Sequence, residues 1–392
     1  MNEAAKTHGL DGTLVEPDWP PLTFGEIRAL LEHFPAVGEP IAIASSSPRP
    51  FSAASVVNTR RGNIFIKRHA HAVRDAEGLM EEHRFMEHLR ANGIGVPRIF
   101  ASDIGETAIE TSDWTYEVHD IPAGLDLYEE AVSWTPFRSS NHARSAGEML
   151  ACLHRAAESY EAPLRKPRPL VASFTIFAAQ DPSKSLEGYL ATRPVLEHDA
   201  QTLRDCEEAL HLLTPFHHEL KPLLLSLHPL WTQNDLHASN LFWSDTNPNS
   251  RATTVIDFGL ADRTNAVYDL AQAIERNIVE WLVLMRDPDH ADQVPVHLDH
   301  LWAMLDGYER VRPLSHGETS ALAPMLALSH AEFALTEAHY FLGILHSPEK
   351  ARVATSDYLV KHAQWFRGWG SQMLIEPLRR WAKTRERQVV RA

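Results

Sequence analysis

One short polar stretch carries side chains that could hold a metal ion and move a proton. Residues 231–243 read WTQNDLHASNLFW, with Asp235 and Asn240 five positions apart between apolar ends. Shortly afterwards the β-branched run TTVID ends abruptly in Asp257. A carboxylate at the end of a buried strand is costly unless it is paired or bound to a metal. These three oxygen-bearing side chains, on adjacent hairpin-like segments, predict a site for Mg²⁺, which prefers hard oxygen ligands.

A lysine far upstream offers a positive charge to the same kind of site. The segment NIFIKRH alternates like a strand. Lys67 and Phe65 lie on one face of this strand, and Ile64, Ile66 and Arg68 lie on the other. A lysine on a mostly apolar strand needs an anion as its partner. The helix expected at 74–92 can supply a carboxylate from Glu82, with Glu81 as the alternative, and nucleotide phosphates can supply the rest.

The charge balance restricts the partners that the chain can take. It has 37 Lys and Arg against 52 Asp and Glu, which gives a formal net charge of −15. A general nucleic-acid binder needs a basic face, so this composition argues against that class. The acidity would suit a cationic small substrate, although a solvated acidic surface is the more ordinary explanation. We therefore expect a small-molecule partner and no nucleic acid.

Cysteine content and hydropathy indicate a cytoplasmic protein. The two cysteines, Cys152 and Cys206, form no CxxC pair, which argues against a disulfide framework and a structural zinc site. No run approaches the length of apolar residues that a transmembrane helix needs, so we expect no membrane contact. The residues MNEAAKTHGLDGTLVEPDWPP are acidic and polar and lack the basic region and apolar core of a signal peptide.

The first third of the chain alternates between strand and helix patterns. Residues 1–22 carry several prolines and no periodicity, so we expect a loose N-terminal arm. Thr23 and Glu26 have the spacing of a capping box that begins a short helix. This order predicts an N-terminal α+β lobe over residues 23–122, built on an antiparallel sheet. Period-two patterns predict its strands at 41–45, 54–59, 63–69, 96–102, 107–111 and 114–120.

Helical periodicity dominates from residue 123 to residue 392, which predicts a larger and mainly helical C-terminal lobe. The stretch 159–200 is rich in proline at first and irregular. A chain of this length exceeds the usual size of a single core, in agreement with two lobes. The helices expected in the large lobe span 140–158, 201–213, 215–225, 268–286, 295–310, 319–346, 350–366 and 370–384.

Together these features resemble the protein-kinase-like fold, in the branch of the aminoglycoside phosphotransferases and choline kinases. The segment QNDLHASN (233–240) is similar to the branch's catalytic loop, His-x-Asp-x-x-x-x-Asn, and IDFG (256–259) matches its metal-binding Asp. LHRAA (153–157) and YDLA (268–271) resemble two helical motifs of the same branch. The resemblance covers about residues 25–345 and implies a nucleotide-binding sheet lobe and a catalytic helical lobe.

The resemblance implies a role for each matching residue. Asp235 would be the catalytic base, which orients the substrate hydroxyl and accepts its proton. Asn240 and Asp257 would hold Mg²⁺ against the phosphates of ATP. Asp269, in YDLA, would brace the catalytic loop. These are the parts that phosphoryl transfer requires: a positioned nucleophile, a bridging metal and neutralised phosphate charge.

The nucleotide side of the site is implied in the same way. Lys67 would contact the α- and β-phosphates and pair with Glu82, and Val118, in the expected strand WTYEVHD, would belong to the nucleotide site. The phosphate-covering loop SSSPRPFSAA has no glycine, unlike a protein-kinase loop. Ser46 and Ser47 in this loop would bind phosphate through their hydroxyls and backbone N–H groups, as in other Ser-containing loops of the branch.

The main departure from the pattern is Gln233, which stands where the branch usually has histidine. That histidine supports the loop by hydrogen bonding. A glutamine amide both donates and accepts hydrogen bonds, so Gln233 can take over the supporting role.

The resemblance thus implies an ATP- and Mg²⁺-dependent phosphotransferase that acts on a hydroxyl of a small molecule. The acceptor stays open among aminoglycosides and other antibiotics, amino alcohols, homoserine and sugars. One alternative is a protein Ser/Thr kinase of the same branch, although no Ala-Pro-Glu activation segment follows IDFGLAD. The other is a nucleotide-binding pseudokinase with a regulatory role. Gln233 and the glycine-free loop favour it, and the intact set Asp235, Asn240 and Asp257 opposes it.

Overall fold

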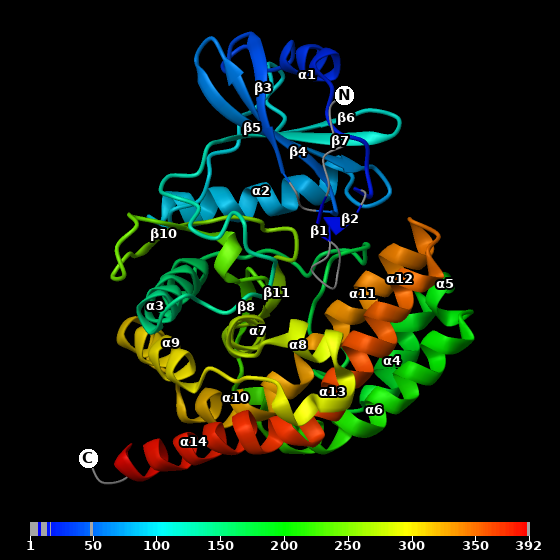
Figure 1. Ribbon diagram of the computed structural model, residues 1–392, viewed down its shortest axis with the longest axis vertical. Coiled ribbons are helices and arrows are strands. Elements are labelled where there is room, and N and C mark those ends of the chain that lie inside the picture. Colours follow the sequence, from blue (N-terminus) through cyan, green and yellow to red (C-terminus); the bar gives the residue numbers. More distant parts are fainter. Residues whose placement is uncertain (1–6, 9–13, 16, 48–49, 390–392) are drawn as a thin grey trace.

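A five-stranded antiparallel sheet forms the small lobe, which lies at the top of Figure 1. The computed structural model describes residues 7–8, 14–15, 17–47 and 50–389. Neighbouring strands follow the order β3-β4-β5-β7-β6, and all are antiparallel, which confirms the predicted α+β lobe. The strands are β3 (Pro40–Ser46), β4 (Ala53–Thr59), β5 (Gly62–Ala70), β6 (Ala108–Glu110) and β7 (Trp114–Asp120). A separate short pair joins β1 (Thr7–His8) to β2 (Leu14–Val15).

Alternation along the strands decides what each face of the sheet carries. Ile66 of β5 and Val118 of β7 point to the side covered by α1 (Phe24–Leu31), where they form part of an apolar core. The opposite face carries Lys67 and is covered by α2 (Ala76–Ala91), which crosses below the sheet in Figure 1. A charged side chain therefore faces the junction with the large lobe, while the aliphatic residues remain in the interior of the small lobe.

Helices make up most of the chain after the sheet, as predicted. Among the described residues, no helix is both long and apolar enough to cross a membrane. The helical elements are α3 (Ser140–Ala157), α4 (Pro182–Ala191), α5 (Pro194–Glu197), α6 (Ala200–Leu220), η1 (Lys221–Ser226), α7 (Ala266–Ile278), α8 (Trp281–Arg286), η3 (Pro288–Gln293), α9 (Leu298–Val311), α10 (His316–Leu328), α11 (His330–Gly343), α12 (Pro348–Arg352), η4 (Val353–Val360), α13 (Lys361–Arg367), η5 (Ser371–Ile375) and α14 (Glu376–Val389).

Two small hairpin-like pairs interrupt the helices near the junction of the lobes. Strand β8 (Pro229–Thr232) pairs antiparallel with β11 (Asp262–Asn265). Strand β9 (Leu241–Trp243) pairs antiparallel with β10 (Ala252–Val255). The polar stretch singled out in the sequence is the connection between β8 and β9. It contains the short turn η2 (Ala238–Asn240).

Several helix boundaries differ from the expectation. The expected helix 319–346 is divided into α10 and α11 at Ser329, and two other differences have a local reason. The expected break before Pro215 is absent, because α6 keeps a buried apolar face, including Leu213, that continues past the proline. The expected helix 268–286 is instead divided into α7 and α8. The division falls at Val279, which has an extended backbone and forms a bridge with Val296. Packing against neighbours therefore overrides local propensity at both places.

Residues 17–22 are not a loose arm, because they are anchored to both lobes. The Asp18 carboxylate accepts a hydrogen bond from Tyr340 Oη at 3.1 Å and lies 2.5 Å from Lys350 Nζ in the large lobe. The indole N–H of Trp19 also reaches the Tyr340 hydroxyl, while its ring packs edge-on against Trp114 of the sheet. Most of the earlier part of the expected arm lies outside the described residues.

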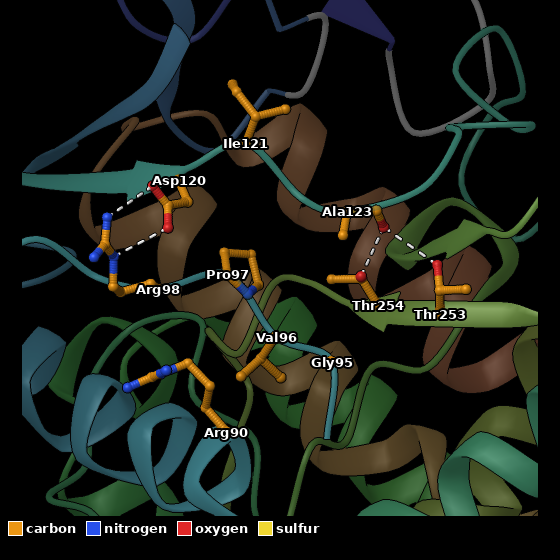
Figure 2. Close-up of a pocket in the computed structure, with 10 residues that line it drawn as sticks. All are labelled: Arg90, Gly95, Val96, Pro97, Arg98, Asp120, Ile121, Ala123, Thr253 and Thr254. Atoms are coloured by element: carbon orange, nitrogen blue, oxygen red, sulfur yellow. Dashed lines mark hydrogen bonds and ion pairs between the residues drawn. The ribbon is translucent and has the colours of Figure 1, made fainter. Parts of the chain in front are cut away.

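Hydrogen bonds join the two lobes in addition to the chain that connects them. The carbonyl of Ala123, just after β7, accepts hydrogen bonds from the hydroxyls of Thr254 at 2.7 Å and Thr253 at 3.2 Å, as Figure 2 shows. The backbone N–H of Val255 donates to Gly95 O, which follows α2, at 2.8 Å. An added Cβ on Gly95 would lie 1.9 Å from the carbonyl oxygen of Thr253, so only glycine permits this approach.

Candidate active site

The connection between β8 and β9 is held in shape by one buried carboxylate. Asp269, at the start of α7, accepts hydrogen bonds from the backbone N–H groups of Gln233 at 3.0 Å and Asn234 at 2.9 Å. The Asp269 carboxylate also lies 3.0 Å from His154 Nε2 of α3. Asn234 has a positive φ of 62°, an uncommon conformation that such bonds can maintain. The structure thus places Asp269 where it can brace the loop.

Gln233 links the loop to the hairpin that carries Asp257. Its side-chain carbonyl accepts the backbone N–H of Asp235 at 2.8 Å. Its amide donates to the backbone carbonyl of Asp257 at 2.7 Å and to that of Ile256 at 3.3 Å. Both ends of the glutamine amide are therefore used, which fits the supporting role expected at this position.

The structure brings Asp235, Asn240 and Asp257 into one site, as the sequence predicts. Asn240 Nδ2 donates to Asp235 Oδ2 at 3.2 Å, and the backbone N–H of Ile256 donates to Asn240 O at 3.0 Å. Asp235 is half-buried, while the other residues of 233–240 are buried, so this carboxylate is the part of the loop that reaches the surface.

The oxygen atoms of this group suit a hard divalent cation. Asp257 is exposed and has a positive φ of 56°, and its Oδ1 lies 3.4 Å from the backbone N of Gly259. Two carboxylates and one amide, with no sulfur or imidazole ligand required, form the donor chemistry that Mg²⁺ prefers. Asn240 and Asp257 fit the pair of protein ligands that the resemblance implies.

Lys67 reaches across from the small lobe to Asp257. Its Nζ lies 3.4 Å from Asp257 Oδ1. Burial alone would lower the pKa of Lys67, but the carboxylates of Asp257, Glu117 and Glu82 outweigh burial and raise its pKa. Partial desolvation opposes ionisation of Asp257 even though its side chain reaches solvent, yet the nearby Lys67 charge holds the pKa of this carboxyl below its ordinary value. The pair is therefore charged at neutral pH.

The expected ion pair between Lys67 and Glu82 does not form in the structure. Glu82 Oε1 instead accepts hydrogen bonds from Arg74 Nε at 3.0 Å and Arg165 Nη2 at 2.7 Å. Both arginines also donate to the backbone carbonyl of Gly259, at 2.8 and 3.2 Å. Through these two arginines, Glu82 of α2 is connected to the IDFG segment. The sequence did not predict Arg74 and Arg165, because both lie outside the motifs that resemble the family.

A second buried carboxylate, Glu117, lies in register with Lys67 on the adjacent strand β7. Three imidazole Nε2 atoms surround it: His83 and His119 lie 2.7 Å from Oε2, and His69 lies 2.9 Å from Oε1. Burial opposes ionisation, but these donors together hold the pKa of Glu117 well below its ordinary value. Glu117 was not predicted, because its histidine partners come from three different elements.

Val118 is placed differently from the expectation. Its side chain is fully buried in the apolar core against α1, and its backbone carbonyl accepts the N–H of Phe100 at 2.8 Å. Adjacent strand residues point to opposite faces, so the neighbours Glu117 and His119, and not Val118, share the face of Lys67. Val118 therefore supports the small lobe and is not available for nucleotide contact.

The two serines of the phosphate-covering loop lie at the end of the edge strand β3. Ser46 pairs with Ser55 of β4, and their hydroxyl oxygens are 3.3 Å apart. The backbone N–H of Ser47 donates to Ala54 O at 2.8 Å, so this N–H is already used within the sheet. The next two residues of the loop, 48–49, lie outside the described residues.

One residue that the sequence did not single out touches the candidate base directly. Arg276 of α7 is fully buried, and its Nη1 contacts Asp235 Oδ1. The guanidinium also lies over the ring of Phe333, with 4.6 Å between Cζ and the ring centroid. A signal was present in the sequence, since Arg276 lies two turns after Asp269 on the same helix.

A separate cavity of about 540 Å³ lies beside the connection between the lobes. Figure 2 shows the segments that line it: the turn after α2, the chain leaving β7, and β10. None of the predicted site residues lines this cavity. The arrangement of charged groups, and not this cavity, therefore identifies the candidate active site.

The fold and this site define a phosphotransferase of the protein-kinase-like class, with carboxylates, an amide and a lysine gathered at the junction of two lobes. The chain belongs to the Phosphotransferase enzyme family (APH), whose sequence model matches residues 51–314. It is therefore a member of a family of small-molecule kinases.

Individual relatives are similar at low identity but over most of the chain. A homoserine kinase of Chelativorans sp. (strain BNC1) is 26% identical over 339 residues, which cover 85% of this chain and 90% of that protein. The structure of a microcompartment-associated aminopropanol kinase has a TM-score of 0.56 at 16% identity, covering 88% of this chain and 97% of that one. The structure of an amicoumacin kinase in complex with AMP-PNP and Ca²⁺ has a TM-score of 0.52 at 14% identity. The match covers 85% of this chain and 90% of that chain.

Proposed function

We propose that this enzyme transfers the γ-phosphoryl group of ATP to a hydroxyl of a small molecule, with Mg²⁺ as cofactor and Asp235 as the catalytic base. The observation that carries the proposal is the convergence of Asp235, Asn240, Asp257 and Lys67 at the lobe junction. Each group has a place in phosphoryl transfer, which depends on positioning and on neutralising phosphate charge. ATP and Mg²⁺ are abundant in the cytoplasm, where we place the activity.

In the proposed reaction the acceptor oxygen attacks the γ-phosphorus of ATP. A new P–O bond forms to the acceptor, the bond to the β-phosphate oxygen breaks, and ADP leaves. The hydroxyl proton passes to Asp235, whose carboxylate is the half-buried group of the loop, and then to solvent. Asn240 and Asp257 would hold Mg²⁺, which neutralises charge on the phosphates. Lys67 would bind the α- and β-phosphates, and the serines at 46 and 47 would lie beside them.

The acceptor that the comparisons favour is homoserine. The homoserine kinase relative aligns over nearly its whole length, whereas the aminopropanol and amicoumacin kinases support the fold alone. All three act on small molecules, and this speaks for a metabolite acceptor over a protein Ser/Thr acceptor. The side-chain hydrogen bonds of Gln233 remove one argument for a pseudokinase, because the loop is supported without histidine.

The test is an ADP-release assay with Mg²⁺ and ATP against homoserine, amino alcohols, aminoglycosides and sugars. We expect turnover with at least one of these acceptors and none with the Asp235→Asn variant. The phosphorylated product is identified by mass spectrometry, which separates transfer to the acceptor from hydrolysis of ATP. Binding of Mg²⁺·ATP without transfer to any acceptor in the panel would contradict the proposal.

A further inference from the structure

A group of aromatic and charged side chains lies beside Asp235, which Arg276 contacts directly. We call it the acceptor-side cluster; its members are Trp134, Arg276, Phe333, Glu337 and Tyr358. Phe333 and Glu337 are one turn apart on α11, and Tyr358 lies in η4. The Trp134 ring stacks on Tyr358, with centroids 5.3 Å apart, and meets Phe333 edge-on. Trp134 is half-buried, whereas the other four are buried.

The polar atoms of this cluster are poorly paired for a protein interior. Apart from the contact with Asp235, the three guanidinium nitrogens of Arg276 have no hydrogen-bond partner in the described part of the chain. The Tyr358 hydroxyl is also without a partner there. Buried polar groups of folded proteins nearly always have hydrogen-bond partners, so a concentration of exceptions beside a catalytic group indicates a ligand.

Two members of the cluster are titratable groups that a charged ligand could meet, Arg276 and Glu337, and both are buried. Burial lowers the pKa of Arg276 to about 10, so the guanidinium is still charged at neutral pH. Glu337 is 3% exposed, and burial raises its pKa to about 8 although the charge of Arg276 opposes the rise, so this carboxyl is mostly protonated at neutral pH. A ligand carboxylate can pair with the charge of Arg276, and a ligand ammonium group can favour the ionised form of Glu337, so that neither ligand charge is buried without a partner.

We propose that the acceptor is a hydroxylated amino acid, whose carboxylate is bound by Arg276 and whose ammonium group is bound by Glu337. This inference depends on the proposed phosphotransfer, because it places the acceptor hydroxyl at Asp235. A guanidinium has five N–H donors and binds carboxylates in a two-pronged manner, and Arg276 uses one nitrogen on Asp235. The carboxylate then lies within a few bonds of the hydroxyl, so the acceptor is small.

The test compares acceptors that differ by one charged group. L-homoserine carries both groups, 3-aminopropan-1-ol lacks the carboxylate, and 4-hydroxybutanoate lacks the ammonium group; L-serine and L-threonine vary the distance to the hydroxyl. Wild-type enzyme is expected to prefer its best amino acid over 3-aminopropan-1-ol by about 100-fold in kcat/KM, since a hydrogen-bonded charge pair contributes about that factor.

The decisive readout is the ratio of kcat/KM for the amino acid to kcat/KM for 3-aminopropan-1-ol. Damage to Asp235 would lower kcat/KM equally for the two acceptors and leave this ratio unchanged. Arg276→Met is expected to reduce the ratio from about 100-fold to a few-fold, while Arg276→Lys keeps part of it. Glu337→Gln is expected to weaken discrimination against 4-hydroxybutanoate. The matched control is Arg286→Met, an exposed arginine on the neighbouring helix α8, which should leave the ratio unchanged.

Each outcome bears on the inference separately from the proposed function. Transfer only to acceptors without a carboxylate would overturn the inference and leave the proposed function in place. If no acceptor is phosphorylated, calorimetry measures whether the same amino acids bind to the enzyme in the presence of Mg²⁺·AMP-PNP. Binding that is lost in Arg276→Met would support the amino-acid site at Arg276 while contradicting the proposed phosphotransfer, and absence of binding would overturn both. An unchanged ratio in Arg276→Met would also overturn the inference.

Discussion

The catalytic loop carries Asp235 and the acceptor-side cluster contacts it through Arg276, and the two regions differ in how completely their polar groups are paired. In the loop, Asp269 accepts two backbone N–H groups and Gln233 uses both ends of its amide. In the cluster, Arg276 and Tyr358 keep buried polar atoms without protein partners among the described residues. The loop is complete as folded, whereas the cluster is not.

This difference separates what the fold needs from what the substrate needs. A fully paired network can hold its geometry without a ligand, so the base and the metal ligands are positioned in advance. Unpaired charges cost stability, and proteins retain them mainly where function requires them. We infer that the loop determines the reaction and the cluster determines the acceptor.

The largest effect is expected from the one side chain that both regions share. Asp235→Asn keeps the shape of the side chain but removes the base, so kcat should fall by about 10²- to 10⁴-fold. Binding of Mg²⁺·ATP should survive, because Lys67, Asn240 and Asp257 are unchanged. Single-turnover assays and calorimetry measure the two quantities. Full activity in the variant would exclude Asp235 as the base.

The next effect tests the claim that the loop is complete without ligand. In the folded protein the two carboxylate oxygens of Asp269 accept the buried backbone N–H groups of Gln233 and Asn234. Asp269→Asn replaces one of these oxygens by an NH₂ group, and the N–H group that loses its acceptor destabilises the fold by about 1 to 3 kcal/mol. The free energy of unfolding should fall accordingly in urea titrations, with or without nucleotide. Asp103→Asn, an exposed site in the small lobe, is the control and should change little. Equal stability of both variants would mean that the loop is not braced by Asp269.

A smaller effect is expected on the nucleotide side. Lys67→Ala removes the charge that faces Asp257 at 3.4 Å and should raise the Michaelis constant for ATP by about 10- to 100-fold. The Michaelis constant for the acceptor should stay nearly the same, since Lys67 faces Asp257 whereas the acceptor-side cluster contacts Asp235. Initial rates over a matrix of both substrates separate the two constants. An unaltered constant for ATP would remove Lys67 from the phosphate site.

A further effect concerns pH and the buried carboxyl of Glu337 in the cluster. Burial raises the pKa of Glu337 from an ordinary value of 4.5 to about 8. The folded protein therefore holds this proton more tightly than the unfolded chain, and its contribution to stability is lost as pH rises from 4.5 to 8. Glu337→Gln cannot ionise, so its melting temperature should exceed that of wild type above pH 8 and match it near pH 4.5. Parallel melting curves at all pH values would contradict this.

Much of the loop and of the sheet lobe could be predicted because their signals are local. The capping box of Thr23 and Glu26 is present in the structure, with both reciprocal hydrogen bonds. The period-two patterns gave strand positions close to β3, β4, β5 and β7. Asp235 and Asn240 come together because only four residues of one short loop separate them. Each of these features depends on residues that are near in sequence.

The rest depends on which distant elements meet, and local pattern does not determine that. Glu82 has the right position on α2 for Lys67, but Arg165, more than eighty residues later, takes its carboxylate. Val118 has the right strand but the wrong face, because a period-two pattern does not say which face a helix covers. Arg276 belongs to the site through the packing of α7 against α11, which no motif encodes.

The glutamine at position 233 has a further consequence for how the enzyme responds to acidity. A histidine in its place would gain a proton near neutral pH and could then no longer both donate and accept. Glutamine has no proton to gain, so the connection from Asp235 N through Gln233 to Asp257 O stays the same as the medium becomes acidic. The alignment of the proposed base with the metal-binding hairpin through Gln233 therefore does not depend on the protonation of the side chain that links them.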